Sequence, residues 1–147
     1  MVTIEHIDIF SCPHGSSEAM CVTTNGMIKN NGRAVMGRGL ALSVENRYHV
    51  AAKLAEHIRM CGNTPCDLGI YDGFHVLSFP TKNDWRNASD LQLIKESSAK
   101  LVQLADDLNL TKIYTVRPGC GLGNLNWETQ VRPAIEPILD NRFIVIL

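Results

Sequence analysis

The sequence predicts an α/β fold in which a mostly parallel sheet is covered by helices on both faces. Short apolar segments alternate along the chain with longer segments of helical periodicity, a pattern typical of parallel strands joined by helices. Residues 74–117 contain one complete strand–helix–strand unit, which we expect to form a right-handed crossover. Two of the expected strands run directly into glycine-rich loops, and each of these loops leads into a helix.

Each expected strand is a short apolar run that ends at turn-forming residues. The first run, residues 3–10, alternates in part between apolar and polar side chains, as a half-buried strand does. Pro80 closes the third run, because proline cannot continue the ladder of a central strand. The expected strands cover residues 3–10, 19–24, 74–79, 112–117 and 143–147.

Helices are expected between these strands, where apolar side chains recur on one helical face. Ser89 has the character of an N-cap, with Gln92 three residues later as its capping-box partner. Asn126 is a second N-cap, and Pro133 and Pro137 are expected to bend or shorten the helix that it starts. The expected helices cover residues 40–60, 91–108 and 126–140.

Length and composition indicate one globular domain over residues 1–147, since 45% of the residues are hydrophobic and 20% are charged. The formal net charge of -1 supplies no general attraction for nucleic acid. No apolar run approaches the length of a membrane span, and the N-terminal segment lacks the basic start and apolar core of a signal peptide. The five cysteines are scattered and contain no C-x-x-C pair. We therefore expect a cytoplasmic, monomeric protein with reduced thiols, no metal site, no cofactor and no membrane partner.

The two glycine-rich loops are the most informative feature of the sequence. One follows the strand at residues 19–24 and contains Gly26, Gly32, Gly37 and Gly39. The other, residues 119–123, follows the strand at 112–117. Loops that leave the carboxyl ends of parallel strands meet at the edge where ligands bind, and their exposed N–H groups suit phosphate. The alternative is that these glycines only make turns.

These loops match neither of two common phosphate-binding motifs. No Gly-Lys-Ser/Thr follows either loop, so neither is a Walker A sequence. Neither contains G-x-G-x-x-G, so a Rossmann dinucleotide site is disfavoured. Two such loops at one sheet edge would suit a diphosphate better than a single phosphate.

Several segments of the chain together resemble the macro domain family. They are Asp8-Ile9-Phe10-Ser11-Cys12-Pro13, then Asn25 leading to Ala34-Val35-Met36-Gly37-Arg38-Gly39-Leu40-Ala41, then Gly119-Cys120-Gly121-Leu122-Gly123. The segment Phe79-Pro80-Thr81-Lys82-Asn83-Asp84-Trp85-Arg86 resembles one branch of that family. This branch holds the terminal ADP-ribose glycohydrolase of animals and the bacterial antitoxin that removes ADP-ribose from thymidine in DNA.

The resemblance covers residues 8–138 and implies a three-layer α/β/α macro domain that binds ADP-ribose. It implies that Asp8, beside Ile9, accepts a hydrogen bond from the adenine amino group, whereas a turn or cap carboxylate is the alternative. Asn25 would lie near the distal ribose or serve only the Asn-Gly turn, and the stretch from 25 to 33 is longer than the matching loop of the relatives. The remaining implied ligand contacts are Ala34, Val35, Met36, Gly37, Gly39, Thr81, Gly119, Cys120, Gly121, Leu122, Gly123 and Asn124.

Lys82 is the catalytic residue that the resemblance implies. In the similar glycohydrolases this lysine attacks the anomeric carbon of the distal ribose and forms a Schiff-base-type adduct that is then hydrolysed. A neutral amine is a competent nucleophile, and we expect an apolar wall of Phe79, Pro80 and Trp85 to favour the neutral form. The alternative is a surface lysine in a polar loop. Gly123 stands where the animal enzyme carries an acidic residue.

The sequence does not assign a general acid or base. His14 and Asp84 were considered, but both are expected to be surface residues. Trp85 with Arg86 has the residue types to hold a nucleic-acid strand by stacking, whereas Trp127 is expected to be a packing anchor. Arg38 has the charge for a phosphate contact, but a solvated loop cation is the favoured interpretation.

Four functions are open at this point. The first is a hydrolase that releases ADP-ribose from ADP-ribosylated protein or DNA, and the second is a non-catalytic reader of ADP-ribose. The chain also fits a phosphatase acting on ADP-ribose 1″-phosphate, or a phosphate-binding regulatory module with no link to ADP-ribose. The residues favour the first.

Overall fold

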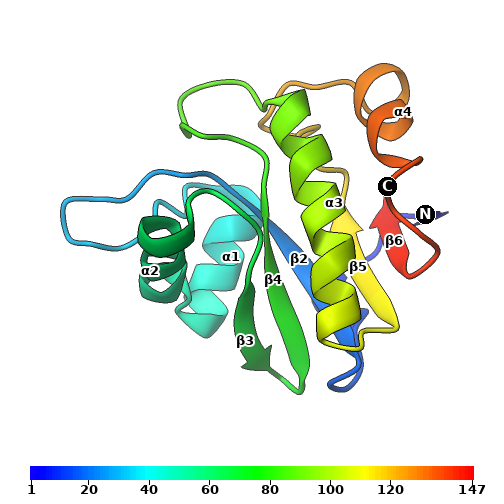
Figure 1. Cartoon of the computed structure of the whole chain (residues 1–147), viewed down its shortest axis with the longest axis horizontal. Coiled ribbons are helices and arrows are strands. Elements are labelled where there is room, and N and C mark those ends of the chain that lie inside the picture. Colours follow the sequence, from blue (N-terminus) through cyan, green and yellow to red (C-terminus); the bar gives the residue numbers. More distant parts are fainter.

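The computed structural model describes all 147 residues and is built on one six-stranded sheet. The strand order is β1-β6-β5-β2-β4-β3, and every neighbouring pair is parallel except β3 with β4. Figure 1 shows β2 and its neighbour β4 running through the middle of the molecule. The strands are β1 (Val2–Ile4), β2 (Glu18–Thr24), β3 (Asp67–Tyr71), β4 (Phe74–Pro80), β5 (Lys112–Val116) and β6 (Phe143–Ile146).

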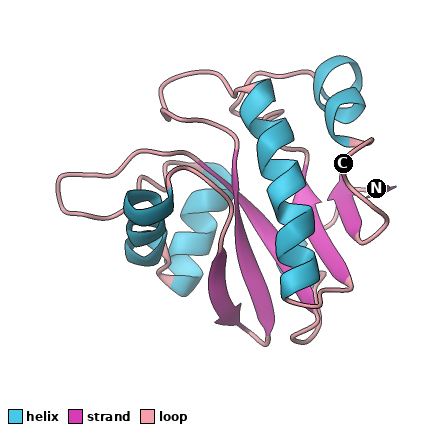
Figure 2. Ribbon diagram, in the orientation of Figure 1, coloured by secondary structure: helices cyan, strands magenta, loops and turns pink.

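Helices cover both faces of this sheet, so the predicted three-layer α/β/α arrangement is confirmed (Figure 2). One apolar core lies under α1 (Gly39–Tyr48) and α2 (Ala51–Cys61), and the other lies under α3 (Leu91–Asp107). The second core also includes the π-helical turn η2 (Trp127–Val131) and the short α4 (Arg132–Ile135). No helix of the structure is both long and apolar enough to cross a membrane.

Strand β2 shows why residues 19–22, in the middle of a central strand, are all apolar. Met20 and Val22 point into the core below α1 and α2, whereas Ala19 and Cys21 point into the core below α3. All four are fully buried. A strand with helices on both faces has no solvent side, so alternation of polar and apolar residues disappears.

The first half of the chain departs from the sequence prediction in two places. The strand expected over residues 3–10 ends at Ile4, and Ile9–Ser11 form a 3-10 turn, η1, capped by the Asp8 carboxylate. The helix expected over 40–60 is broken at His49, whose φ of 55° is left-handed. Glu45 stabilises this break, because its carboxylate accepts a hydrogen bond of 2.7 Å from the amide of Ala51, where α2 begins.

The remaining departures concern one strand that was not predicted, the N-cap of α3 and the extent of the final helix. β3 was not predicted, and it lies antiparallel at the sheet edge beside β4. Asp90, not Ser89, is the N-cap of α3, because its carboxylate accepts hydrogen bonds from the amides of Gln92 and Leu93. The expected final helix is confined to η2 and α4, and residue 126 caps it as predicted.

An aromatic cluster ties α1 to the turn between β3 and β4. The hydroxyl of Tyr48, the last residue of α1, donates a 2.7 Å hydrogen bond to Asp72. The Tyr48 ring stacks on Tyr71 with the ring centres 4.9 Å apart. Burial, and then the hydrogen bond to Asp72, raise the pKa of Tyr48 to about 12.

Candidate functional site

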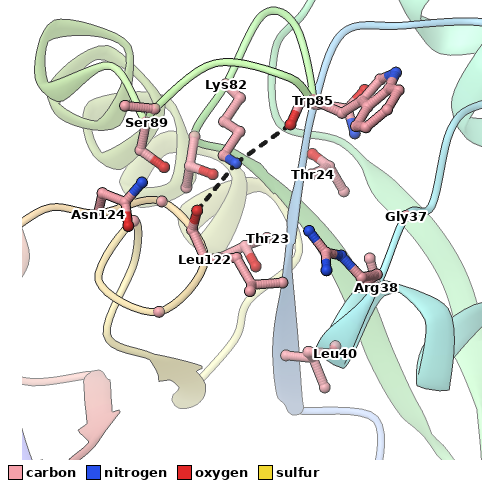
Figure 3. A pocket seen from close by; sticks show the side chains of 18 of the residues that line it. Thr23, Thr24, Gly37, Arg38, Leu40, Lys82, Trp85, Ser89, Leu122 and Asn124 are labelled. Carbon is pink, nitrogen blue, oxygen red and sulfur yellow. Dashed lines mark hydrogen bonds between the residues drawn. The ribbon is translucent and has the colours of Figure 1, made fainter.

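The carboxyl ends of the parallel strands meet at one edge of the sheet, and the loops that leave them enclose a crevice. It consists of two adjoining hollows of about 510 Å³ and about 520 Å³, which share Leu40, Val116, Arg117 and Gly121. The first hollow is lined by residues 23–25, 36–41, 81–82, 85–89, 116–117, 119 and 121–124 (Figure 3). The second hollow is lined by residues 6–10, 40, 116–117, 120–121 and 146–147.

The first wall of the crevice is the loop from β2 to α1. Gly37 and Gly39 have φ values of 56° and 65°, a region that side chains with a Cβ rarely adopt. α1 begins at Gly39, and its N-cap residue Arg38 makes no side-chain capping hydrogen bond. The first turn of α1 lines the hollow through residues 39–41, so its free N–H groups and the positive end of its dipole face the crevice.

Asn25 holds this loop in shape and also lines the first hollow. Its side-chain amide donates to the carbonyl of Val35 over 3.0 Å, and its Oδ1 accepts from the amide of Met27 over 2.9 Å. Ala34 and Val35 lie in the adjoining arm of the loop and do not line either hollow. The Asn-Gly turn chemistry that the sequence left open is therefore present.

The second wall is the loop from β5 to η2, and it packs closely against the start of α3. Gly119 has a φ of 77°, and a Cβ there would lie 2.8 Å from the side chain of Ile94. A Cβ on Gly123 would overlap the Ser89 hydroxyl and lie 2.5 Å from the carbonyl oxygen of Gly119. The backbone of this wall therefore has no room for an acidic side chain at Gly123.

The second wall differs from the first in its helix. Asn126 accepts a hydrogen bond from the amide of Thr129, so the helix start is closed by its own side chain. Asn126 also does not line the crevice. The positive helix end that faces the crevice is therefore that of α1. Cys120 lines the second hollow, and burial raises the pKa of its thiol, which disfavours the reactive thiolate.

Lys82 lies where the third wall, the loop after β4, meets the second. Its Nζ is 3.4 Å from the carbonyl oxygen of Leu122 and 3.5 Å from that of Trp85, and Figure 3 shows it reaching between these segments. The apolar wall expected around Lys82 is mostly absent, because Phe79 and Pro80 are buried and do not line the hollow.

Asn63, in the segment after α2, positions this loop and was not predicted from the sequence. Its side-chain amide donates to the carbonyl of Lys82 and to Oδ1 of Asn83, both over 2.9 Å. The amide of Gly26 donates to the carbonyl of Asn83 over 3.2 Å, which joins the loop to the first wall. Because Asn63 is distant in sequence from the loop after β4, no sequence pattern indicates this contact.

The lining of the first hollow is strongly cationic. It includes Arg38, Lys82, Arg86 and Arg117 and no aspartate, glutamate or histidine. These four charges contrast with the formal net charge of -1 for the whole chain. Arg38, for which a solvated loop cation was favoured over a phosphate contact, lines the hollow, and Arg117 was not selected from the sequence. A cleft with one sign of charge attracts anionic ligands.

Neither of the side chains considered as an acid or base lines the crevice. His14 is exposed and precedes β2, at the end of that strand away from Asn25. Asp84 is held by the guanidinium of Arg86, whose hydrogen bonds lower the pKa of this carboxyl to about 2. The lining of the first hollow therefore contains no carboxylate and no imidazole.

The second hollow contains Asp8 and Ile9, as the sequence predicted for one end of the ligand. Asp8 is also a cap, which was the alternative role expected for it, because its Oδ1 accepts a 3.1 Å hydrogen bond from the amide of Phe10. The side chain is exposed, so its other carboxylate oxygen is open to a ligand.

Two buried hydroxyls in the lining of the first hollow have no hydrogen-bond partner in the protein. They belong to Thr24 and Ser89, which are 6% and 8% exposed. Buried polar groups are nearly always hydrogen-bonded, so both are candidates for contact with a ligand or water. The sequence offered no signal for either.

Comparisons with known proteins agree with this picture, although no family model matches the chain. The DNA ADP-ribosyl glycohydrolase of Mycobacterium tuberculosis is 30% identical over 123 residues, covering 78% of this chain and 35% of that protein. The protein of the same name from Thermus aquaticus is 26% identical over 115 residues, covering 72% of this chain and 31% of that protein. The chain thus spans about a third of the length of the curated relatives it matches.

Solved structures match over nearly the whole chain. The macrodomain of Mycobacterium tuberculosis DarG aligns with a TM-score of 0.70 at 25% identity, covering 99% of this chain and 97% of that one. The macrodomain of Thermus aquaticus DarG aligns with a TM-score of 0.71 at 22% identity, covering 98% and 97%. Thermosipho africanus DarTG in complex with ADP-ribose aligns with a TM-score of 0.69 at 23% identity, covering 88% of this chain and 37% of that one.

The three-layer sheet and the crevice between its glycine-rich loops define the chain as a macro domain. Within that class it is of the DarG type, because its sequence relatives are named DNA ADP-ribosyl glycohydrolase and its structural neighbours include DarG macrodomains.

Proposed function

We propose that this macro domain binds ADP-ribose in the crevice and hydrolyses the bond that joins ADP-ribose to DNA. The observation that carries the proposal is the position of Lys82, whose amine lies between two crevice walls in a hollow without carboxylates. The names of the sequence relatives favour DNA over protein as the acceptor.

The two hollows suit the two ends of an elongated ligand. Adenine occupies the second hollow, where Asp8 accepts a hydrogen bond from its amino group and Ile9 contacts the ring. The diphosphate lies across the N-terminus of α1, beside Gly37 and Gly39. The distal ribose then enters the first hollow, beside Lys82, Thr81 and the loop at 119–124. Arg38, Lys82 and Arg117, which form no salt bridge in the structure, offset the charge of the diphosphate.

Lys82 is the nucleophile of the proposed reaction. Arginine stays protonated, so Lys82 is the one side chain of the cationic set that can become a neutral amine. Its Nζ attacks C1″ of the distal ribose, and the C1″–acceptor bond breaks with its electron pair leaving on the acceptor, which takes a proton. The sugar ring opens to a Schiff-base-type adduct. Water then adds to the adduct, the C–N bond breaks, and ADP-ribose and the free amine are released.

The test compares wild type with Lys82→Ala and Lys82→Arg on an ADP-ribosylated single-stranded oligonucleotide. We expect release by wild type and a loss of at least a hundredfold in both variants, with free ADP-ribose still bound in calorimetry. Borohydride should trap a covalent adduct with wild type only. Undiminished release by Lys82→Ala would refute the lysine mechanism.

A non-catalytic reader of ADP-ribose is the second candidate. Its support is the absence of any carboxylate or histidine from the first hollow, together with the lack of room for an acid at Gly123. Binding of free ADP-ribose without release from DNA or protein by wild type would favour it.

A further inference from the structure

Trp85 presents a large aromatic ring to solvent at the mouth of the first hollow. The residue is 49% exposed, and its carbonyl oxygen is 3.5 Å from Nζ of Lys82 (Figure 3). The other tryptophan, Trp127, is buried in the core under α3. An exposed tryptophan beside the proposed nucleophile contributes little to the core, so its surface is available to whatever occupies the mouth of the crevice.

The backbone around Trp85 is fixed even though its ring is free. Arg86 forms two hydrogen bonds with the Asp84 carboxylate, of 3.0 and 2.6 Å, and its amide forms a third of 3.0 Å. The neighbouring Asn83 is held by Asn63 and by Gly26. The ring is therefore presented on a braced loop, which lowers the entropy lost when a partner packs against it.

The charge around the ring selects the kind of partner. The Arg86 side chain is 61% exposed, and Arg38 lines the same hollow. No carboxylate lines the hollow, and the nearby Asp84 is already paired with Arg86. An anionic partner that also carries flat rings satisfies both features. A single-stranded nucleic acid has both, whereas a protein acceptor has no regular backbone phosphate.

We propose that Trp85 stacks on a base of the single-stranded nucleic acid that carries the ADP-ribose, with Arg86 on an adjacent phosphate. This inference rests on the proposed function, because it names the residue that binds the acceptor strand. Stacking of a base on an aromatic side chain accepts any base, so Trp85 sets the preference for nucleic acid over protein and not for a sequence.

Tryptophan fluorescence tests the contact without any turnover. Because Trp127 is buried, a short unmodified oligothymidylate should quench the emission of Trp85 in wild type. The quenching should be lost in Trp85→Ala, and the affinity for the oligonucleotide should fall about tenfold or more. Trp85→Phe should keep part of the affinity. Met60→Ala, which removes a side chain 78% exposed and outside the crevice lining, is the control and should leave the affinity unchanged.

Kinetics on an ADP-ribosylated oligonucleotide separate this inference from the proposed function. Trp85→Ala should raise KM about tenfold with little change in kcat, while its affinity for free ADP-ribose falls far less. If wild type releases ADP-ribose and Trp85→Ala has the same KM and the same oligonucleotide affinity, the stacking role is refuted and the function stands. If wild type releases nothing but the Trp85-dependent quenching is observed, the function fails and the contact stands.

Discussion

The α-carbon of Gly123 faces the hydroxyl of Ser89 so closely that no side chain fits between them. The amide of Ser89 also donates a 2.9 Å hydrogen bond to the carbonyl of Gly123, which fixes the two segments against each other. The loop that forms the second wall is thereby joined to the start of α3. Glycine at this position is a packing requirement of the wall.

Gly123→Ala should weaken ADP-ribose binding by about tenfold or more, because the methyl group must push the second wall away from Ser89. Met60→Ala is the control, since this side chain is exposed and lies outside the lining of the crevice. Calorimetry with free ADP-ribose measures both. Equal affinities for the two variants would contradict the packing argument.

Gly123→Glu should not restore the carboxylate found in the animal enzyme. We expect lower release of ADP-ribose than in wild type, because the side chain cannot be accommodated without displacing the loop. Release assays on ADP-ribosylated DNA measure this, and faster turnover by the variant would show that the loop can rearrange around an acid.

Asp8→Ala should weaken ADP-ribose binding about tenfold or more, since a hydrogen bond to a charged group contributes roughly 1.5–3 kcal/mol. The same change removes the cap on the amide of Phe10. Asp8→Asn separates the two roles, because its amide oxygen can still cap the turn while the charge is lost. Calorimetry should give an intermediate affinity for Asp8→Asn, and unchanged affinity in both variants would defeat the adenine assignment.

Asn63→Ala should slow the release of ADP-ribose about tenfold with a small change in affinity for free ADP-ribose. Its side chain holds the carbonyl of Lys82, and small displacements of a reacting group cost large factors in rate. Asn46→Ala is the control, because Asn46 is exposed and lies outside the lining of the crevice. A normal rate for Asn63→Ala would mean that the other bonds of the loop suffice.

Tyr48 should make the stability of the fold depend on alkaline pH. Burial and Asp72 raise its pKa from an ordinary value near 10 to about 12 in the folded chain. The neutral phenol is therefore favoured by folding, so its stabilisation is complete below about pH 10 and is lost as pH rises from 10 to 12. Urea midpoints measured across this range should fall for wild type and fall less for Tyr48→Phe.

The sequence was sufficient for the parts of the fold that depend on local pattern. The central strands and the two glycine-rich loops follow from apolar runs and from glycines that end them. β3 was missed because Asp67 and Gly69 interrupt its apolar pattern, and its pairing with β4 holds it in place. The break at His49 was not predicted because the apolar periodicity continues across it. The hydrogen bond from the amide of Ala51 to the Glu45 carboxylate, which stabilises the break, leaves no trace in the sequence pattern.

Site residues that belong to a local sequence motif could be predicted. Site residues that depend on contacts between segments distant in sequence could not. Gly37, Gly39 and Lys82 line the crevice as expected. The contact of Asn63 with Lys82 spans 19 residues, so no local pattern shows it. Ala34 and Val35 lie outside the lining because the long loop from Asn25 forms a hairpin-like arm, closed by the bridge between Ile28 and Ala34.

The crevice is assembled from loops that follow four different strands, so the complete site exists only when the whole sheet has formed. A ligand that contacts all of these loops binds the native chain and not the unfolded one. Saturating ADP-ribose should therefore raise the melting temperature, by a free energy that grows with the logarithm of its concentration over Kd. Occupancy of the crevice would in this way protect β1 and β6, which form one edge of the sheet beside the second hollow, against unfolding and proteolysis.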